Sequence, residues 1–127
     1  MKFRFKADYG LVFVRVKVSC ADREVFLNLA LDTGASGTIV SAKKLQEVGY
    51  DLDKPEDEVY ITTGSGLIFV PKITIEKLMT LGKEKTNFQI IAHDFPPTSS
   101  VDGVLGLDFL RENVLTIDFV KGEIELG

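Results

Sequence analysis

The sequence predicts an all-β protein built as a closed sheet or barrel. Apolar and polar residues alternate with a period of two over several segments, as in residues 11–18, where every second residue is a valine. Such alternation places successive side chains on opposite faces of a strand. Turn-forming residues separate many short segments of this kind, which is typical of all-β barrels. The 127 residues suit one compact unit, so we expect a single domain over residues 1–127.

The expected strands follow one another along most of the chain. Phe3 and Phe5 alternate with basic residues and indicate a first strand, and Tyr9–Gly10 is the predicted turn into the strand at 11–18. The remaining strands are expected at 25–31, 38–40, 58–62, 67–70, 73–75, 79–81, 87–92, 114–119 and 123–126.

Two short helices interrupt this pattern. Ser41 is a typical N-cap and Gly49 a typical C-terminal residue, so we expect a helix over 42–48. A second helical segment is expected near 107–112.

A glycine-rich tip joins two of the expected strands. Gly64, Ser65 and Gly66 lie between the runs at 58–62 and 67–70, which predicts a β-hairpin. A phosphate-binding loop would instead be followed by a helix, whose N-terminus holds the anion. A strand follows here, so we favour the hairpin.

Composition excludes several classes of function. The net charge of -4 argues against a nucleic-acid-binding protein, which usually carries a basic face. No apolar run reaches the ~18 residues that a membrane-spanning helix needs. The first residues alternate basic and aromatic side chains and so do not suggest a signal peptide. Cys20 is the single cysteine, which excludes an internal disulfide, and we expect a cytoplasmic protein.

The segment Asp32-Thr33-Gly34-Ala35 directly follows the apolar run at 25–31. Desolvating a carboxylate costs several kcal/mol unless it is hydrogen-bonded or can hold a proton. The glycine would let backbone amides approach the carboxyl group and fix it in place. A fixed titratable group is what acid–base chemistry needs, although aspartate is also common in purely structural turns.

Three features in order give the chain a family resemblance. The string at 29–36 contains the Asp-Thr-Gly-Ala motif, the glycine-tipped hairpin follows, and Val104-Leu105-Gly106 then leads into 107–110. Together they resemble the retropepsin-like aspartic proteases across nearly the whole chain. The resemblance implies a retropepsin-like closed barrel with a flap hairpin at Gly64-Ser65-Gly66. It also implies that Val104-Leu105-Gly106 packs beneath the acidic loop.

The resemblance also implies roles for the acidic loop. Asp32 would be the catalytic carboxylate, and the Thr33 hydroxyl would bond to the same loop of a second subunit. Gly34 would present a backbone amide near the carboxyl group and to the substrate, and Ala35 continues the loop. Ser36 stands where viral relatives usually carry a second acidic residue that contacts the substrate backbone.

The implied activity is that of an aspartic endopeptidase. Two adjacent carboxyl groups share one proton, so one activates water while the other polarises the peptide carbonyl. Each chain has a single Asp-Thr-Gly sequence, so the second carboxyl group would come from a second copy in a homodimer. The substrate would be an extended peptide or protein, with no metal or cofactor required. The alternative is a dimeric, non-catalytic peptide-binding or scaffolding module of the same fold.

Other candidate residues are assigned less demanding roles. Asp51, Asp53 and Asp57 begin with the spacing of a calcium loop, but the obligatory glycine and closing glutamate are missing, so we expect a solvated acidic loop. His93, the only histidine, lacks the partners of a zinc site or a serine triad and is expected in a loop.

Three further residues are assigned structural roles. Cys20 is expected to be a small buried apolar residue, because no histidine is paired with it by sequence. Asp102 and Asp108 flank two glycines, and we expect them to cap the second helix.

Overall fold

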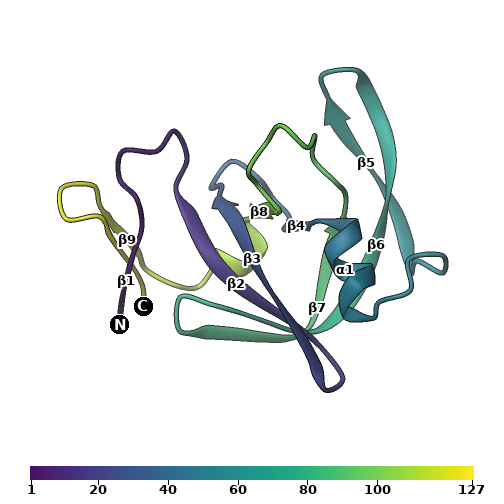
Figure 1. The fold of residues 1–127 in the computed structure, drawn as a ribbon, viewed down its shortest axis with the longest axis horizontal. Helices are drawn as coiled ribbons and strands as arrows, with labels where there is room; N and C mark the ends of the chain where they lie inside the picture. The colour runs from purple at the N-terminus through teal and green to yellow at the C-terminus, as the bar shows by residue number, and fades with distance from the viewer.

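Ten strands and two short helices make up the fold, which a computed structural model describes for all residues, 1–127 (Figure 1). The elements are β1 (Lys2–Arg4), β2 (Phe13–Cys20), β3 (Arg23–Leu31), β4 (Ile39–Val40), α1 (Ala42–Val48), β5 (Asp57–Thr63), β6 (Gly66–Thr80), β7 (Lys83–Ala92), β8 (Gly103–Leu105), α2 (Leu107–Leu110), β9 (Leu115–Asp118) and β10 (Glu123–Leu126).

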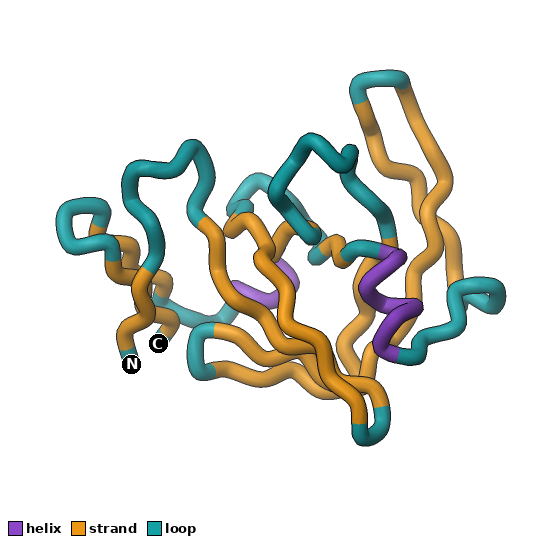
Figure 2. The backbone as a smooth tube through the Cα atoms, in the orientation of Figure 1, coloured by secondary structure: helices purple, strands orange, loops and turns teal.

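The strands form two sheets. The smaller sheet has the order β1-β10-β9, and the larger has the order β2-β3-β8-β4-β7-β6-β5. An additional pairing between β2 and β6 closes six strands of the larger sheet into a barrel, with β5 left outside it. Strands therefore dominate the backbone, and the helices are short inserts between them (Figure 2). The predicted all-β, retropepsin-like closed barrel is confirmed.

The core lies inside this barrel and follows from the period-two pattern. Val14, Val16 and Val18 of β2 are buried, while Arg15 between them is exposed. Strand β3 pairs antiparallel with β2 over its whole length and buries Leu27 and Leu29 on the same side. Burying each such side chain contributes roughly 1.5–3 kcal/mol, so the alternation fixes the register of the two strands.

Strand β6 corrects the sequence-based division of this region. The segments predicted at 67–70, 73–75 and 79–81 are one continuous strand of 15 residues. The strand changes partners along its length, pairing with β5 up to Lys72 and with β7 from Lys72 onward. The strand continues through Pro71, which still pairs with Glu58 of β5, and through Glu76, whose side chain is exposed.

The chain termini also pair differently from the prediction. Strand β1 does not form a hairpin with β2 across Tyr9–Gly10; it pairs with β10, with Lys2 opposite Glu125. Residues 5–12 therefore connect two sheets, and the two ends of the chain lie side by side (Figure 1). The Met1 amino group reinforces this pairing through an ion pair with Glu125 at 3.0 Å.

Helix α1 has the predicted bounds, because its end signals are local. The Ser41 side chain accepts a hydrogen bond from the Lys44 amide, and Gly49 ends the helix with a φ of 123°. Leu45 and Val48 are buried against the barrel. Neither helix has the length and apolar character needed to cross a membrane. The cytoplasmic location stays a prediction.

Tyr50 anchors the segment after α1 to the barrel wall. Its hydroxyl donates to the Ser19 carbonyl at 2.6 Å and accepts from the Glu76 amide at 2.8 Å. Burial raises the pKa of Tyr50 to about 12, from its ordinary value of 10.0. The folded protein therefore favours the neutral phenol. The resulting contribution to the free energy of unfolding is complete below pH 10, where Tyr50 is neutral in both states, and is lost as the pH rises toward 12, because the unfolded chain ionises first.

We predict that Tyr50→Phe lowers the free energy of unfolding by about 1–2 kcal/mol at neutral pH, because two hydrogen bonds lose their shared partner. The variant should also lose the phenolate absorbance change that titrates at about pH 12. Urea unfolding and an ultraviolet pH titration measure the two effects. Tyr60→Phe is the control, since the Tyr60 side chain is exposed and makes no hydrogen bond. Equal losses in both variants would contradict the prediction.

Candidate active site

Asp32 lies directly beyond β3, at the end of its apolar run. Its amide donates to the Leu105 carbonyl at 3.0 Å, which fixes the backbone of the turn. The Gly34 amide donates to Asp32 Oδ1 at 2.9 Å, as the sequence predicted. Oδ2 makes no hydrogen bond within the chain, and the side chain is half-exposed. One carboxylate oxygen is thus held by the turn while the other is available for an external partner.

The rest of the acidic loop is largely open to solvent. Thr33, Gly34 and Ser36 are exposed, and Ala35 is half-buried. Ala35 connects the loop to the body of the protein, because its amide donates to the Asp32 carbonyl at 3.2 Å and its own carbonyl accepts from Leu107 at 2.8 Å. The loop therefore presents the aspartate and the threonine outward from a backbone that is fixed at both ends.

Val104-Leu105-Gly106 lies against this loop. Val104 and Leu105 belong to β8, which pairs parallel with the end of β3 and antiparallel with β4. Gly106 follows in such a confined space that a Cβ atom there would lie 2.6 Å from the Gly37 carbonyl oxygen. A side chain at position 106 would thus push directly on the acidic loop.

Thr38 and Asp108 complete the support of the loop, and the sequence did not indicate this role for either. The Thr38 hydroxyl donates to Asp108 Oδ1 at 2.7 Å and accepts from the Gly106 amide at 3.1 Å. The Thr38 amide donates to Asp108 Oδ2 at 3.0 Å. Thr38 is fully buried and Asp108 is half-buried, so the bond from Gly106 is shielded from water and the two bonds to Asp108 are partly shielded. Bonds to a carboxylate are stronger than bonds between neutral groups.

The prediction that Asp102 and Asp108 cap the second helix is wrong. The residue before α2 is Gly106, and no side chain makes a cap hydrogen bond there. Asp108 lies inside α2 and bonds to Thr38, while the Asp102 carboxylate accepts from the Asn28 amide at 2.9 Å. Both aspartates bond to backbone groups that are distant in sequence, so each joins separate parts of the barrel.

The predicted hairpin forms, with a two-residue turn at Gly64 and Ser65. Thr63 pairs with Gly66 across the turn, and Gly66 has a φ of 116°, which favours glycine. Strand β7 pairs with β6 only from Lys72 onward. Between Lys72 and the tip, β5 and β6 pair only with each other, and this part of the hairpin projects from the body (Figure 1). Ile61 and Ile68 pair across one of its faces and are half-buried.

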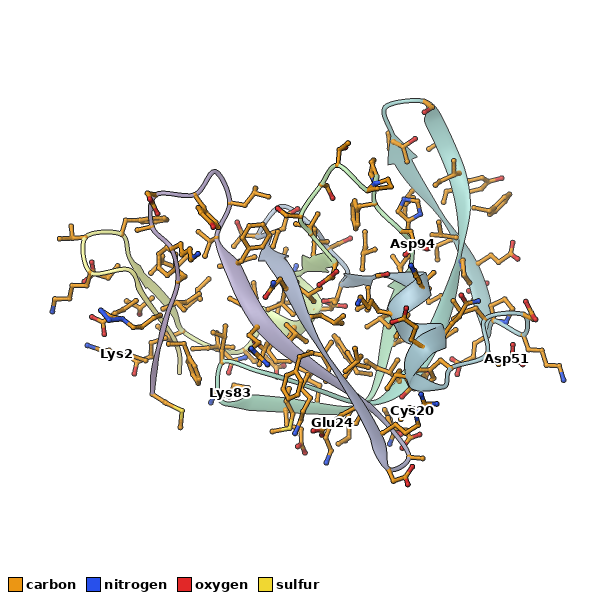
Figure 3. The ribbon with its side chains drawn as sticks, viewed as in Figure 1. Lys2, Cys20, Glu24, Asp51, Lys83 and Asp94 are labelled. Atoms are coloured by element: carbon orange, nitrogen blue, oxygen red, sulfur yellow. The ribbon has the colours of Figure 1, made fainter.

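Two grooves adjoin this hairpin. One of about 670 Å³ lies under the tip and is lined by residues of the tip, Ile61 and Ile68 of the hairpin, Ile39, and the segment 93–96 after β7. Figure 3 shows Asp94 of this segment between α1 and the hairpin. The other groove, of about 520 Å³, is lined by Ser36 of the acidic loop, the 59–61 segment of β5 and part of β7. Asp32 lines neither groove, so one chain does not bring the carboxylate and the hairpin tip into a shared pocket.

The remaining candidates have structural surroundings. His93 follows β7 in a loop, as expected, and its ring packs edge-on against Phe95. Cys20 is half-buried at the end of β2, not buried as expected, and desolvation raises the pKa of its thiol. Asp51 accepts a hydrogen bond from the Asp53 amide within its exposed loop. No group of three or more histidine, cysteine, aspartate or glutamate side chains is arranged to hold a metal ion.

Comparisons with known proteins agree with this arrangement. Residues 16–112 match a protein family described as "gag-polyprotein putative aspartyl protease", and this range includes the acidic loop, the hairpin tip and Val104-Leu105-Gly106. The fold is similar to the crystal structure of a retropepsin-like aspartic protease from Rickettsia conorii. The TM-score is 0.67 and the identity 23%, over 99% of this chain and 88% of that one. At this identity the likeness concerns the fold. No curated protein matches the sequence.

We predict that Thr38→Val lowers the free energy of unfolding by roughly 2–4 kcal/mol, because it leaves the Gly106 amide and one Asp108 oxygen without their partner. Thr80→Val is the matched control, since this buried threonine makes one side-chain hydrogen bond, to the Arg15 carbonyl. Its cost should be about 1 kcal/mol. Urea unfolding of both variants provides the measurement, and an equal or smaller cost at position 38 would refute the supporting role.

Proposed function

Since the chain belongs to the gag-polyprotein family of retropepsin-like aspartyl proteases, we propose that it is an aspartic endopeptidase that works as a homodimer. The observation that carries the proposal is the state of the Asp32 carboxyl group. The Gly34 amide holds one of its oxygens, the other has no partner in the chain, and a partly buried network supports the loop from below. A purely structural aspartate in a turn would not need that support.

The chemistry requires a second carboxyl group. In the proposed dimer, Asp32 takes a proton from a water molecule while the protonated Asp32 of the partner subunit donates to the peptide carbonyl oxygen. The water oxygen attacks the carbonyl carbon to give a tetrahedral diol. The C–N bond then breaks as Asp32 passes the proton it took from water to the departing nitrogen, and a hydroxyl of the diol returns its proton to Asp32 of the partner subunit. Two adjacent carboxyl groups share one proton, so activity should peak at mildly acidic pH and disappear when both ionise.

The hairpin and its grooves favour an extended, apolar substrate. An extended peptide can hydrogen-bond to a hairpin in the manner of an added strand. Ile39, Ile61 and Ile68 give the groove under the tip an apolar part, and Phe95 adds an aromatic side chain to it. We therefore propose apolar side chains next to the cleaved bond, with the hairpin closing over them and excluding water.

We predict that Asp32→Asn reduces peptide cleavage roughly 10²–10⁴-fold, because the amide keeps the shape of the side chain but cannot exchange a proton. Cleavage of a mixed peptide library, followed by mass spectrometry, provides the readout. Asp22→Asn is the control, since Asp22 is exposed in the turn between β2 and β3 and makes no side-chain hydrogen bond. This variant should cut like the wild type.

The same experiment separates the enzyme from the non-catalytic module. If the wild type binds peptides from the library but cuts none, and Asp32→Asn binds them equally well, the module is the better description. Equal cleavage by the wild type and Asp32→Asn would show that Asp32 is not the catalytic residue.

A mixing experiment tests the dimer. After subunit exchange, equal amounts of wild type and Asp32→Asn would leave a quarter of the dimers with two intact carboxyl groups, so activity per wild-type chain should fall to about half. An equal amount of Asp22→Asn should leave the activity per intact chain unchanged. Sedimentation at the same concentrations reports the state of association. Undiminished activity in a preparation that sediments as a monomer would contradict the homodimer.

A further inference from the structure

A third groove lies where the two sheets meet. It has a volume of about 450 Å³, within the usual range for small-molecule sites. Strands β1 and β10 of the terminal sheet line one side of it, and β2, β3 and the β6–β7 hairpin line the other. None of its lining residues belongs to the acidic loop, the hairpin tip at 64–66 or α2. It is therefore separate from the candidate active site.

The wall of this groove is apolar and deformable. Eight of its 14 lining residues are hydrophobic, and they include Phe3, Phe13, Phe26, Met79, Leu81 and Ile124. Phe26 is 49% exposed, which is a large uncovered area for an aromatic side chain on a barrel. The unbranched Met79 side chain can adjust to a flexible ligand.

All the charged side chains that line the groove are basic. Arg4, Arg15, Lys17 and Lys83 line it, and no aspartate or glutamate does, although the whole chain has a net charge of -4. Lys17 is paired with Glu24 at 3.5 Å, whereas the other three take part in none of the four ion pairs of the molecule. The Arg15 guanidinium lies over the Phe26 ring, 4.5 Å from its centre. Figure 3 shows Lys83 between the terminal strands and the β2–β3 hairpin.

The lining side chains offer almost no hydrogen-bond acceptor. Thr80 is the only uncharged polar side chain among them, and its hydroxyl already donates to the Arg15 carbonyl. A peptide would bring backbone N–H groups that need acceptors, and leaving them unpaired is costly. An alkyl chain has no such requirement. The combination of apolar wall and unpaired cations fits an anionic head on a hydrocarbon tail.

We propose that this groove binds a long-chain monocarboxylate, the chemical class of the fatty acids. The carboxylate pairs with the free cations at the rim, and the tail lies on the aromatic and methionine side chains. Both sheets line the groove, so the ligand also ties the terminal strands to the barrel. The proposal does not depend on the peptidase activity.

Calorimetric titration of the full-length wild-type protein with octanoate, decanoate and dodecanoate, below their micellar concentrations, tests the tail. Affinity should rise about threefold to fourfold for each added methylene group. Dodecanol and dodecyltrimethylammonium have the same tail with a neutral or a cationic head, and both should bind at least about tenfold more weakly than dodecanoate. Affinity independent of chain length, or equal affinity for dodecanol, would overturn the proposal.

A charge-matched pair of variants tests the head. Combined Arg4→Gln, Arg15→Gln and Lys83→Gln should weaken dodecanoate binding at least about tenfold. Combined Lys43→Gln, Lys54→Gln and Lys121→Gln removes the same charge from exposed positions outside the groove and should leave binding unchanged. Equal effects of the two sets of substitutions on dodecanoate binding would overturn the proposal. An acidic, apolar peptide that binds as tightly as dodecanoate and displaces it would also overturn the proposal. Should the first set fail to fold, the chain-length series and the dodecanol comparison on the wild type still decide.

Discussion

Hydrogen bonds around Thr38 hold the acidic loop in place. They join residue 38 to residue 108, seventy positions apart, and bring the Gly106 amide to the same hydroxyl. No buried side-chain polar atom in the molecule is left without a partner, so this network is satisfied. A satisfied network resists displacement, because each lost bond would leave a polar group unpaired. Asp32 is thus held directly by Leu105 and Gly34, and its loop is supported from below by Thr38 and Asp108, which Asp32 does not touch. Acid–base chemistry is highly sensitive to such positioning.

Features that depend on neighbouring residues could be predicted from the sequence, and features that depend on distant partners could not. Helix α1 has both of its end signals within nine residues, and its bounds were predicted correctly. The sequence predicts three separate segments where the structure has the single strand β6, because the strand changes its partner from β5 to β7 at Lys72 and both partners are distant in sequence from part of it. The position of Asp108 beside two glycines suggested a cap, and only the fold reveals Thr38 as its partner. The Gly-x-Asp spacing of Gly106 and Asp108, directly after β8, is the one sequence signal for this supporting role of Asp108.

The candidate site shows the same division. The Asp-Thr-Gly turn and the glycine-tipped hairpin are local, and both have the predicted geometry. The grooves beside the hairpin are built mainly from β4, β5, β6, β7 and the segment after β7, whose relative placement depends on barrel closure. Composition and periodicity carry no information on that closure beyond the fold class. The sequence shows the alternation of apolar and polar residues within the hairpin. That Ile61 and Ile68 face a groove, however, depends on how the hairpin is placed relative to β7.

The proposed chemistry needs a second carboxyl group, whereas the terminal strands find their partners within one chain. Strand β1 pairs with β10 of the same chain. The hydrophobic core is likewise formed from one chain, and its polar groups are satisfied within it. In the proposed dimer, self-association adds a carboxyl group to the site. Since the dimer population follows concentration by mass action, the proposed activity would rise with chain concentration.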